Sequence, residues 1–334
     1  MSGKESAILF FSALAASCLL TVALCHWIIP ILRAHHVGQH IFSDYVSEHR
    51  SKEGTPTMGG VCFIIPVLLL LVVYAIVFVR RGEGSLLPLA LTVCLGVANA
   101  LIGFADDYTK LAHKENQGFA SWQKFLLQVV VASAYLWAMS AFANSNTTVR
   151  IPVLNTSYDL GVWYYVVCLV VIVGVINSTN LTDGIDGLAS SVTMTVCMCS
   201  AVLAAFLGHR SAFALSALMV GAMVGFLMYN FHPAKVFMGD TGSLFIGGVL
   251  VGLGFMLDEP LLMLLMCGVF ILDMLSSLIQ IISIRLFHRK VFRIAPVHHQ
   301  FQQMHWSEER IVYVFSGVSV LLGILAVVLG VSFR

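Results

Sequence analysis

Long apolar runs separated by short polar segments make up almost the whole chain. Nine stretches contain no Asp, Glu, Lys or Arg, and a tenth holds a single acid, Asp273. A helix that spans a bilayer needs about 20 mainly apolar residues. The pattern predicts ten spanning helices, within residues 6–32, 54–79, 84–105, 125–149, 160–182, 187–209, 211–234, 241–257, 260–284 and 311–333.

Composition places the protein in the membrane class. Of its 334 residues 59% are hydrophobic and 10% are charged, whereas a soluble domain carries about 25% charged residues. Barrel strands would show alternating segments of about ten residues, and these runs do not alternate. The eight cysteines all fall inside apolar runs and form no CxxC pair, which indicates buried apolar residues. We therefore expect an all-α integral membrane protein with a single membrane-embedded domain over residues 1–334.

Charge indicates how the chain lies in the membrane. Ten spans put both termini on one side and divide the loops into two sets. The set 33–56, 106–124, 178–188, 230–243 and 285–310 holds 12 of the 18 Lys and Arg residues. Loops rich in Lys and Arg stay in the cytoplasm. The termini are thus predicted to be periplasmic, and the polar clusters in these loops predict a working face on the cytoplasmic side.

The segment KEGTPTMGG (52–60) begins the second apolar run. Thr-Pro followed by Gly-Gly predicts a bent helix start with exposed backbone N–H groups, which suits an anion. The alternative is a capped helix start that has proline in its first turn and needs no ligand.

The segment GFADDYTK (103–110) ends the third run with two adjacent acids, Asp106 and Asp107. Neighbouring carboxylates repel each other unless a positive group lies between them. A divalent metal or a lysine would serve, and Lys110 lies on the same side if the helix continues. The alternative is an acidic helix end facing water, which opposes the helix dipole.

A third polar segment, NSTNLTDGIDGLA (177–189), interrupts the apolar pattern. Asn180, Asp183 and Asp186 recur every three residues, so one helical turn would gather them on one side. Gly184 and Gly187 permit close approach of the backbone to a ligand. The spacing lacks the terminal Glu of an EF-hand. A capped loop without a ligand is the alternative.

Two more segments complete the set. In YNFHPAKVFMGDTGSL (229–244), Asp240 stands at the predicted start of a helix, as a ligand or as an N-cap. Phe237 is an aromatic platform or an interfacial residue. In FRIAPVHHQFQ (292–302), His298 and His299 suggest metal or phosphate binding. The mid-span acid Asp273 indicates either a functional site or a pairing with a polar group of a neighbouring span.

The coincidence of these clusters on one face indicates a chemistry. Mg²⁺ prefers one or two carboxylates together with substrate phosphates, and Lys and His suit anionic oxygens. The spans provide a route for a lipid. The residues predict phosphoryl transfer between a soluble diphosphate and a membrane lipid.

Taken together and in order, KEGTPTMGG, GFADDYTK, NLTDGIDGLA, VFMGDTGSL and APVHHQF resemble the motifs of the bacterial phospho-N-acetylmuramoyl-pentapeptide transferases (translocase I). These belong to the polyprenyl-phosphate N-acetylhexosamine-1-phosphate transferases. The resemblance covers nearly the whole chain. It implies transfer of phospho-MurNAc-pentapeptide from UDP-MurNAc-pentapeptide to undecaprenyl phosphate, giving lipid I and UMP, with Mg²⁺, at the bacterial inner membrane. A homodimer is compatible with the sequence and not specified by it.

The resemblance also implies roles for individual residues. It makes Asp106, Asp107, Asp240 and His298 catalytic, with Asp240 and Asp107 holding the metal. Asn180, Asp183 and Phe237 would line the nucleoside pocket, with Phe237 stacked on uracil. The substrate-binding residues that it implies are Lys52, Thr57, Lys110, Lys114, Asn180, Asp183, Asp186, Asn230, Phe237, Gln280 and His299.

One motif departs from the family pattern. The family has three histidines followed by an acid, as in APIHHHFE, whereas this chain has Gln300 and Gln302 at the third histidine and acid positions. A sister enzyme that transfers N-acetylglucosamine-1-phosphate to the same lipid is the close alternative, although that group carries a different histidine motif. A transporter or flippase is the alternative from another class. It would place polar groups near the bilayer midplane in inverted repeats, and no repeat is visible.

Overall fold

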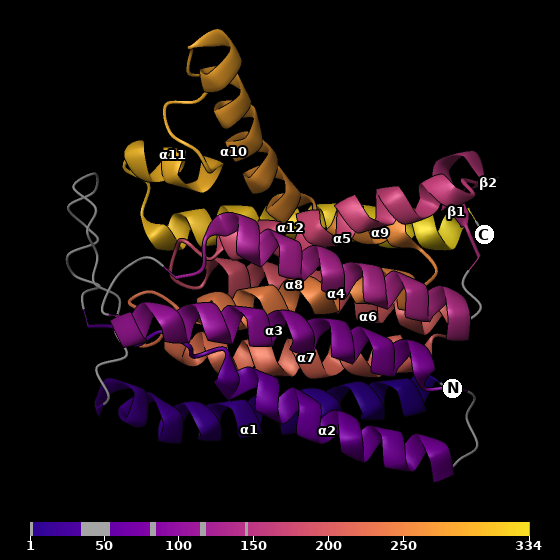
Figure 1. Cartoon of the computed structure of the whole chain (residues 1–334). Coiled ribbons are helices and arrows are strands. Elements are labelled where there is room, and N and C mark those ends of the chain that lie inside the picture. The colour runs from indigo at the N-terminus through magenta and orange to yellow at the C-terminus, as the bar shows by residue number, and fades with distance from the viewer. Residues whose placement is uncertain (1–2, 35–53, 81–84, 114–117, 144–145, 334) are drawn as a thin grey trace.

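The computed structural model describes residues 3–34, 54–80, 85–113, 118–143 and 146–333 (Figure 1). Ten helices in this part of the chain are long and apolar enough to cross a membrane, which confirms the predicted number. They are α1 (Gly3–Ala34), α2 (Val61–Arg80), α3 (Leu87–His113), α4 (Ser121–Phe142), α5 (Val162–Thr182), α6 (Leu188–Leu207), α7 (Arg210–Asn230), α8 (Gly239–Met256), α10 (Gly268–Phe287) and α12 (Glu308–Ser332).

The prediction of an all-α chain is wrong in one loop. Strands β1 (Thr148–Ile151) and β2 (Thr156–Asp159) form an antiparallel hairpin between α4 and α5. The β-branched residues of TVRI favour a strand. The short 3₁₀ helix η2 (Pro152–Leu154), followed by Asn155 in the left-handed region, reverses the chain.

The apolar run 260–284 is divided into two helices. The seven-residue α9 (Pro260–Met266) precedes α10, and α10 leaves the bundle at a steep angle (Figure 1). A further short helix, α11 (Val297–Gln303), lies beside α10 and connects to α12. The basic loop that precedes α11 is thus carried away from the bundle.

Helix α8, the shortest predicted span, is the centre of the structure. All of its residues from Thr241 to Met256 are buried. It packs most extensively against α3 and then against α5. Close packing of spanning helices requires small residues at the contact. Gly96 and Gly103 of α3 and Gly248 and Gly252 of α8 meet this requirement, because a Cβ at any of them would lie within 3 Å of the opposite helix.

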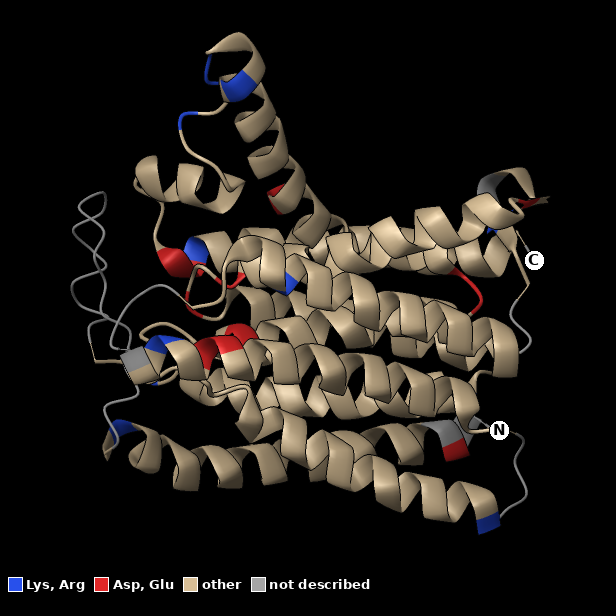
Figure 2. Ribbon diagram, in the orientation of Figure 1, with Lys and Arg blue, Asp and Glu red and all other residues tan. Residues whose placement is uncertain are grey.

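Charged residues of the described chain lie mostly near the ends of the helices, and few lie in the middle of the bundle (Figure 2). Both chain termini lie at one end of the bundle (Figure 1), as an even number of spans requires. At that end Arg150 of β1 pairs with the buried Glu259 at 2.5 Å and donates to the carbonyl oxygen of Phe333. The opposite end carries the C-terminus of α3 and the N-terminus of α8.

The contact between α3 and α8 generates a prediction. A Cβ at Gly103 would lie 2.2 Å from the carbonyl oxygen of Asp240, so Gly103→Ala must push the two helices apart. We expect the free energy of unfolding to fall by about 1–3 kcal/mol, as overpacked cores do. Thermal unfolding of the purified protein in detergent measures this effect.

The matched control is Gly317→Ala on α12, where a Cβ would meet no atom within 4 Å. It should unfold at the wild-type temperature. Equal unfolding temperatures for both variants would contradict the role given to the α3–α8 contact.

Candidate active site

Three aspartates meet where α3 passes the N-terminus of α8. Asp106 and Asp107 lie three and four residues after Gly103, and Asp240 lies in the first turn of α8. One carboxylate oxygen from each lies within 4.8 Å of those of the other two. Asp106 is fully buried and Asp107 is 3% exposed. We call these three residues the carboxylate cluster. The close contact at Gly103 places it, because α3 can approach α8 there without a side chain between them.

Two lysines bridge Asp106 and Asp240. Lys110 Nζ lies 2.6 Å from Asp106 Oδ2 and 3.3 Å from Asp240 Oδ2. Lys124 Nζ, from α4, lies 3.3 and 2.8 Å from the same two oxygens. The predicted alignment of Lys110 with the paired acids is therefore confirmed. From the sequence Lys124 stands out only as a loop charge, because no local pattern relates it to Asp240, 116 positions further along the chain.

Asp107 has a different set of partners. Its Oδ1 accepts from the backbone N–H of Asp240 at 3.2 Å. Its Oδ2 accepts from the backbone N–H of Thr241 at 3.0 Å and from the Thr241 hydroxyl at 2.7 Å. Asp107 therefore caps α8 from another helix. A carboxylate in this position is stabilised by the helix dipole and satisfies N–H groups that have no partner within the helix.

The donor chemistry of the carboxylate cluster suits a divalent cation. Three carboxylates carry three negative charges, and Lys110 and Lys124 supply two positive charges. Carboxylate oxygens are the ligands that Mg²⁺ takes from proteins. The short mutual distances of the oxygens allow a single ion to contact more than one of them. Asp106 belongs to this group together with the two predicted ligands, Asp107 and Asp240.

Asn180 joins the cluster from α5. Its Nδ2 donates to Asp240 Oδ1 and to Ser243 Oγ, both at 2.9 Å. The prediction that one helical turn gathers Asn180, Asp183 and Asp186 is wrong, because α5 ends at Thr182. Asp183 is the half-buried residue after that end, and its N–H donates to Asn180 O at 3.3 Å. Asp186 lies in the following turn and faces a different group.

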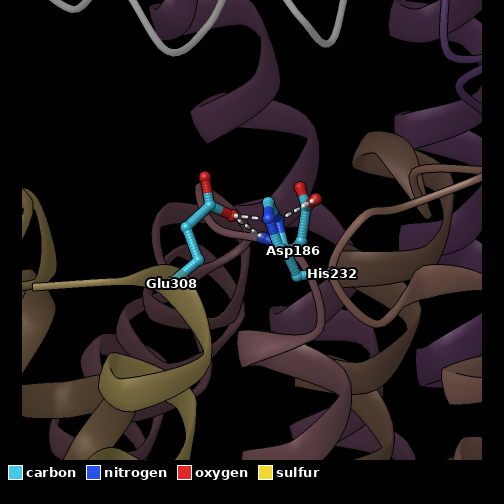
Figure 3. Close-up of side chains that lie close together, drawn as sticks. All are labelled: Asp186, His232 and Glu308. Carbon is cyan, nitrogen blue, oxygen red and sulfur yellow. Dashed lines mark hydrogen bonds and ion pairs between the residues drawn. The ribbon is translucent and has the colours of Figure 1, made fainter.

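Asp186, His232 and Glu308 form a second polar group, which we call the clasp (Figure 3). Asp186 Oδ2 lies 3.1 Å from His232 Nδ1 and accepts from Ala234 N at 2.9 Å. Glu308 Oε2 accepts from Asp186 N at 3.2 Å and lies 3.5 Å from His232 Nδ1. The clasp joins the loop after α5, the loop before α8 and the first turn of α12. His232 and Glu308 were not singled out from the sequence, since their partners are distant along the chain.

The segment before α2 pairs with the segment before α8. Gly59 N donates to Phe237 O at 2.8 Å, Gly60 N donates to Met238 O at 2.9 Å, and Phe237 N donates to Pro56 O at 2.8 Å. The exposed N–H groups expected at Gly59 and Gly60 are therefore occupied, so the anion interpretation of these groups is wrong. The alternative, proline in the first turn, is also wrong, since α2 begins at Val61.

Two predicted substrate residues lie beside these segments. Thr57 is 5% exposed, and a Cβ at Gly239 would lie 2.8 Å from its Oγ1 and 2.6 Å from Asp107 Oδ2. Thr57 thus borders the carboxylate cluster. The side chain of Asn230 is buried, accepts from Ser190 Oγ at 2.7 Å and donates to Val236 O at 3.0 Å. It holds the loop that leads to α8.

The histidine motif lies on α11 against α10. His298 and Asp273 are both fully buried, and His298 Nδ1 lies 2.8 Å from Asp273 Oδ2. His299 Nδ1 lies 2.7 Å from Gln302 Oε1. Of the two interpretations of Asp273, the structure favours pairing with a polar group, and that group belongs to α11. Gln280 accepts from the N–H groups of Val291 and Phe292 at 3.0 and 2.9 Å and so supports the loop before α11.

The structure brings most of the predicted residues to one end of the bundle but in separate groups. Lys52 and Lys114 lie outside the described residues. Phe237 is half-buried, and its backbone pairs with Gly59 and Pro56 two residues before Gly239. The carboxylate cluster contacts the end of α5 through Asn180. The clasp and the pair Asp273–His298 contact the loop between α5 and α6, through Asp186 and Gly184 respectively.

Comparison with known proteins identifies the family of the chain. The model of glycosyl transferase family 4 matches residues 89–258, and the first phospho-N-acetylmuramoyl-pentapeptide-transferase signature matches residues 52–64. A phospho-N-acetylmuramoyl-pentapeptide-transferase of Bacillus subtilis strain 168 is 37% identical over 323 residues, which is 97% of this chain and 98% of the relative.

Two further relatives carry the same name. One from Clostridium botulinum strain Eklund 17B is 37% identical over 94% of each chain. One from Staphylococcus aureus strain bovine RF122 is 36% identical over 97% of this chain and 100% of the relative. The chain therefore belongs to the phospho-N-acetylmuramoyl-pentapeptide transferases, within glycosyl transferase family 4.

Proposed function

We propose that this protein transfers phospho-N-acetylmuramoyl-pentapeptide from its UDP carrier to undecaprenyl phosphate, in the membrane part of peptidoglycan synthesis. The observation that carries the proposal is the carboxylate cluster bridged by Lys110 and Lys124 at one end of a ten-span bundle. Phosphoryl transfer asks mainly for positioning and for neutralisation of charge. A site of carboxylates and ammonium groups beside the membrane supplies both for a soluble diphosphate and a lipid phosphate.

The transfer proposed is a displacement at phosphorus. An oxygen of the lipid phosphate forms a bond to the phosphorus that carries the sugar. The bond from that phosphorus to the bridging oxygen breaks, and UMP leaves with that oxygen. A phosphate monoester has a second pKa of about 6, so it is a nucleophile at neutral pH without a strong general base. We expect Lys110 and Lys124, which lie at the carboxylate cluster, to contact the phosphate oxygens.

Mg²⁺ is the metal that this donor set fits, with Asp240 and Asp107 as the proposed ligands and Asp106 close by. When bound, it neutralises charge on the diphosphate oxygens. The residues of the chain hold the proposed ligands in position. Asn180 holds Asp240 from the side of α5, and Asp107 fixes the first turn of α8 on which Asp240 stands.

Direct attack by the lipid phosphate is preferred to a two-step route through an aspartyl-phosphate on Asp107. Three donors, Asp240 N, Thr241 N and Thr241 Oγ1, already contact the Asp107 carboxylate. An attack by Asp107 would remove hydrogen bonds from the start of the central helix. The capping of α8 by Asp107 therefore supports a single displacement.

The remaining features of the proposal follow from the distribution of residues. One membrane-embedded domain spans residues 1–334 in the bacterial inner membrane, with both termini in the periplasm. The site faces the cytoplasm, where the UDP-linked sugar is available, as the 12 of 18 Lys and Arg in the loops at that end support. Asn180, Asp183 and Phe237 bind the nucleoside. A homodimer stays a prediction.

The first test measures UMP release by purified protein in detergent with undecaprenyl phosphate. UDP-MurNAc-pentapeptide with Mg²⁺ is expected to release UMP, and UDP-N-acetylglucosamine is not. Chelation of the metal should stop release, and added Mg²⁺ should restore it. Release from UDP-N-acetylglucosamine alone would assign the chain to the sister activity, and release from neither would reject the proposed function.

The second prediction concerns Asp240. The Asp240→Asn substitution removes one negative charge from the carboxylate cluster and keeps its shape. Loss of such electrostatic stabilisation is expected to lower kcat roughly 1,000-fold or more. The protein should still fold and enter the membrane. Steady-state UMP release and thermal unfolding measure the two properties.

A matched control is Asp159→Asn, the same change at an exposed acid of β2 at the other end of the bundle. It should keep wild-type kinetics. Full activity of Asp240→Asn would remove Asp240 from the site.

The third prediction separates the two substrates. Phe237→Ala should raise the KM for the UDP-linked substrate about 10-fold, because a base stacked on an aromatic ring is worth roughly 1–3 kcal/mol. The KM for undecaprenyl phosphate should stay near the wild-type value. Phe287→Ala, at a 68% exposed ring at the end of α10, is the control and should change neither. An equal rise in both KM values would contradict the nucleoside role of Phe237.

A further inference from the structure

We propose that the end of α10 and the loop after it bind the headgroups of anionic phospholipids at the membrane surface. We call residues 285–293 (RLFHRKVFR) the basic tip. Its partner is the bulk lipid of the phosphatidylglycerol class, in the leaflet at the end of the bundle that carries the carboxylate cluster. This surface takes no part in the transfer chemistry proposed above and does not depend on it.

The basic tip carries positive charge that its own segment does not compensate. Arg285, Arg289, Lys290 and Arg293 are all exposed. No Asp or Glu occurs in the sequence from residue 274 to residue 307. The two lysines of the carboxylate cluster, in contrast, lie between acids. A group of roughly four to eight Lys or Arg next to the end of a spanning helix is typical of proteins that bind anionic lipids.

The position of the basic tip places it at a membrane surface. Helix α10 leaves the bundle at a steep angle, and its end lies well to the side of the other helices (Figure 1). The Lys and Arg residues at this end lie toward the same end of the bundle as the carboxylate cluster (Figure 2). The lipid that surrounds the bundle therefore also surrounds the far end of α10, and the basic tip meets the headgroups of that leaflet.

The exposed residues of α10 change character at Arg285. Ile282 and Ile284 are exposed, as expected of a helix that faces acyl chains. Basic side chains begin at the next residue, and Leu286 and Val291 stay exposed among them. Long Lys and Arg side chains near the end of a spanning helix keep their apolar stems in the lipid and extend their charges to the headgroups. This mixture of exposed basic and apolar residues is typical of a membrane interface.

Hydrogen bonds hold the basic tip in a defined shape. His288, in the left-handed region, follows the last residue of α10 and reverses the chain. Ser283 Oγ donates to Arg289 O at 2.8 Å, and Gln280 Nε2 donates to Phe292 O at 2.9 Å. The loop is thus folded back against the last turns of α10, which gathers the basic residues. Like charges gathered in this way repel each other, and an anionic surface removes that repulsion.

The test uses the full-length protein in vesicles of phosphatidylcholine with a minor share of phosphatidylglycerol. A trace of one lipid or the other carries the same photoactivatable group on its acyl chain, and mass spectrometry of chymotryptic peptides locates the label. We expect phosphatidylglycerol to label the basic tip more strongly than phosphatidylcholine. The ratio should fall as NaCl is added, because salt screens the attraction. Equal labelling by both lipids, or no labelling of the tip by either, would overturn the proposal.

A double variant tests the charges directly. Arg289→Gln with Lys290→Gln removes two of them from exposed positions, so the fold should be kept. We expect the ratio of phosphatidylglycerol to phosphatidylcholine labelling at the tip to fall at least about 5-fold, since each Lys or Arg near an anionic surface contributes roughly that factor. Arg289→Lys with Lys290→Arg keeps both charges and should keep the ratio. An unchanged ratio in the glutamine variant, or an equal loss in the exchanged variant, would contradict the inference.

The matched control is Arg33→Gln with Lys235→Gln. Both residues are exposed and lie together at the same end of the bundle, where Arg33 Nη2 donates to Lys235 O at 3.3 Å. The control removes the same number of charges and should leave the labelling of the tip unchanged. An equal loss in this control would mean that the total charge of the protein attracts the lipid, and the proposal would fail. Labelling needs no turnover, so the result is independent of the proposed transfer reaction.

Discussion

The close approach of α3 to the first turn of α8 is the contact on which the site depends. Gly103 allows the backbones to touch, and the carboxylates that follow it then lie against the N-terminus of a helix buried along its length. Two buried carboxylates beside a third that is partly exposed are unfavourable unless cations and N–H groups surround them. Lys110, Lys124 and the first N–H groups of α8 meet that condition. The packing of α3 against α8 and the charge balance of the carboxylate cluster therefore depend on each other.

The sequence predicted the spans well because a bilayer imposes a length and a composition on each of them. It also identified the acids, since charged residues stand out against long apolar runs. It did not predict how the loop after α5 divides its residues. The period of three suggested one group, but α5 ends at Thr182, so Asn180 and Asp186 contact different partners. The end of a helix depends on tertiary contacts that spacing alone does not contain.

The sequence also did not predict which residues distant along the chain contact the acids. Lys124 and Glu308 lie in segments without a motif, and His232 lies in a segment that was singled out for other residues. The packing of α4, α12 and the loop after α7 brings these three side chains to the acids. Asp273 shows the same limit, although here the sequence did identify the acid itself. Its cost in an apolar span indicated a polar partner, yet the partner lies on α11, a short helix in a segment where the apolar pattern predicted only a loop.

The lysines of the carboxylate cluster have a consequence for biogenesis. A site built only from carboxylates would hold its helices apart until an ion arrived. Here each Lys already bridges Asp106 and Asp240, and α8 supplies N–H groups to Asp107. The newly inserted chain thus carries its own counterions. Helices α3, α4 and α8 can associate in the membrane as soon as they are synthesised, whatever the supply of divalent cations in the cell at that moment.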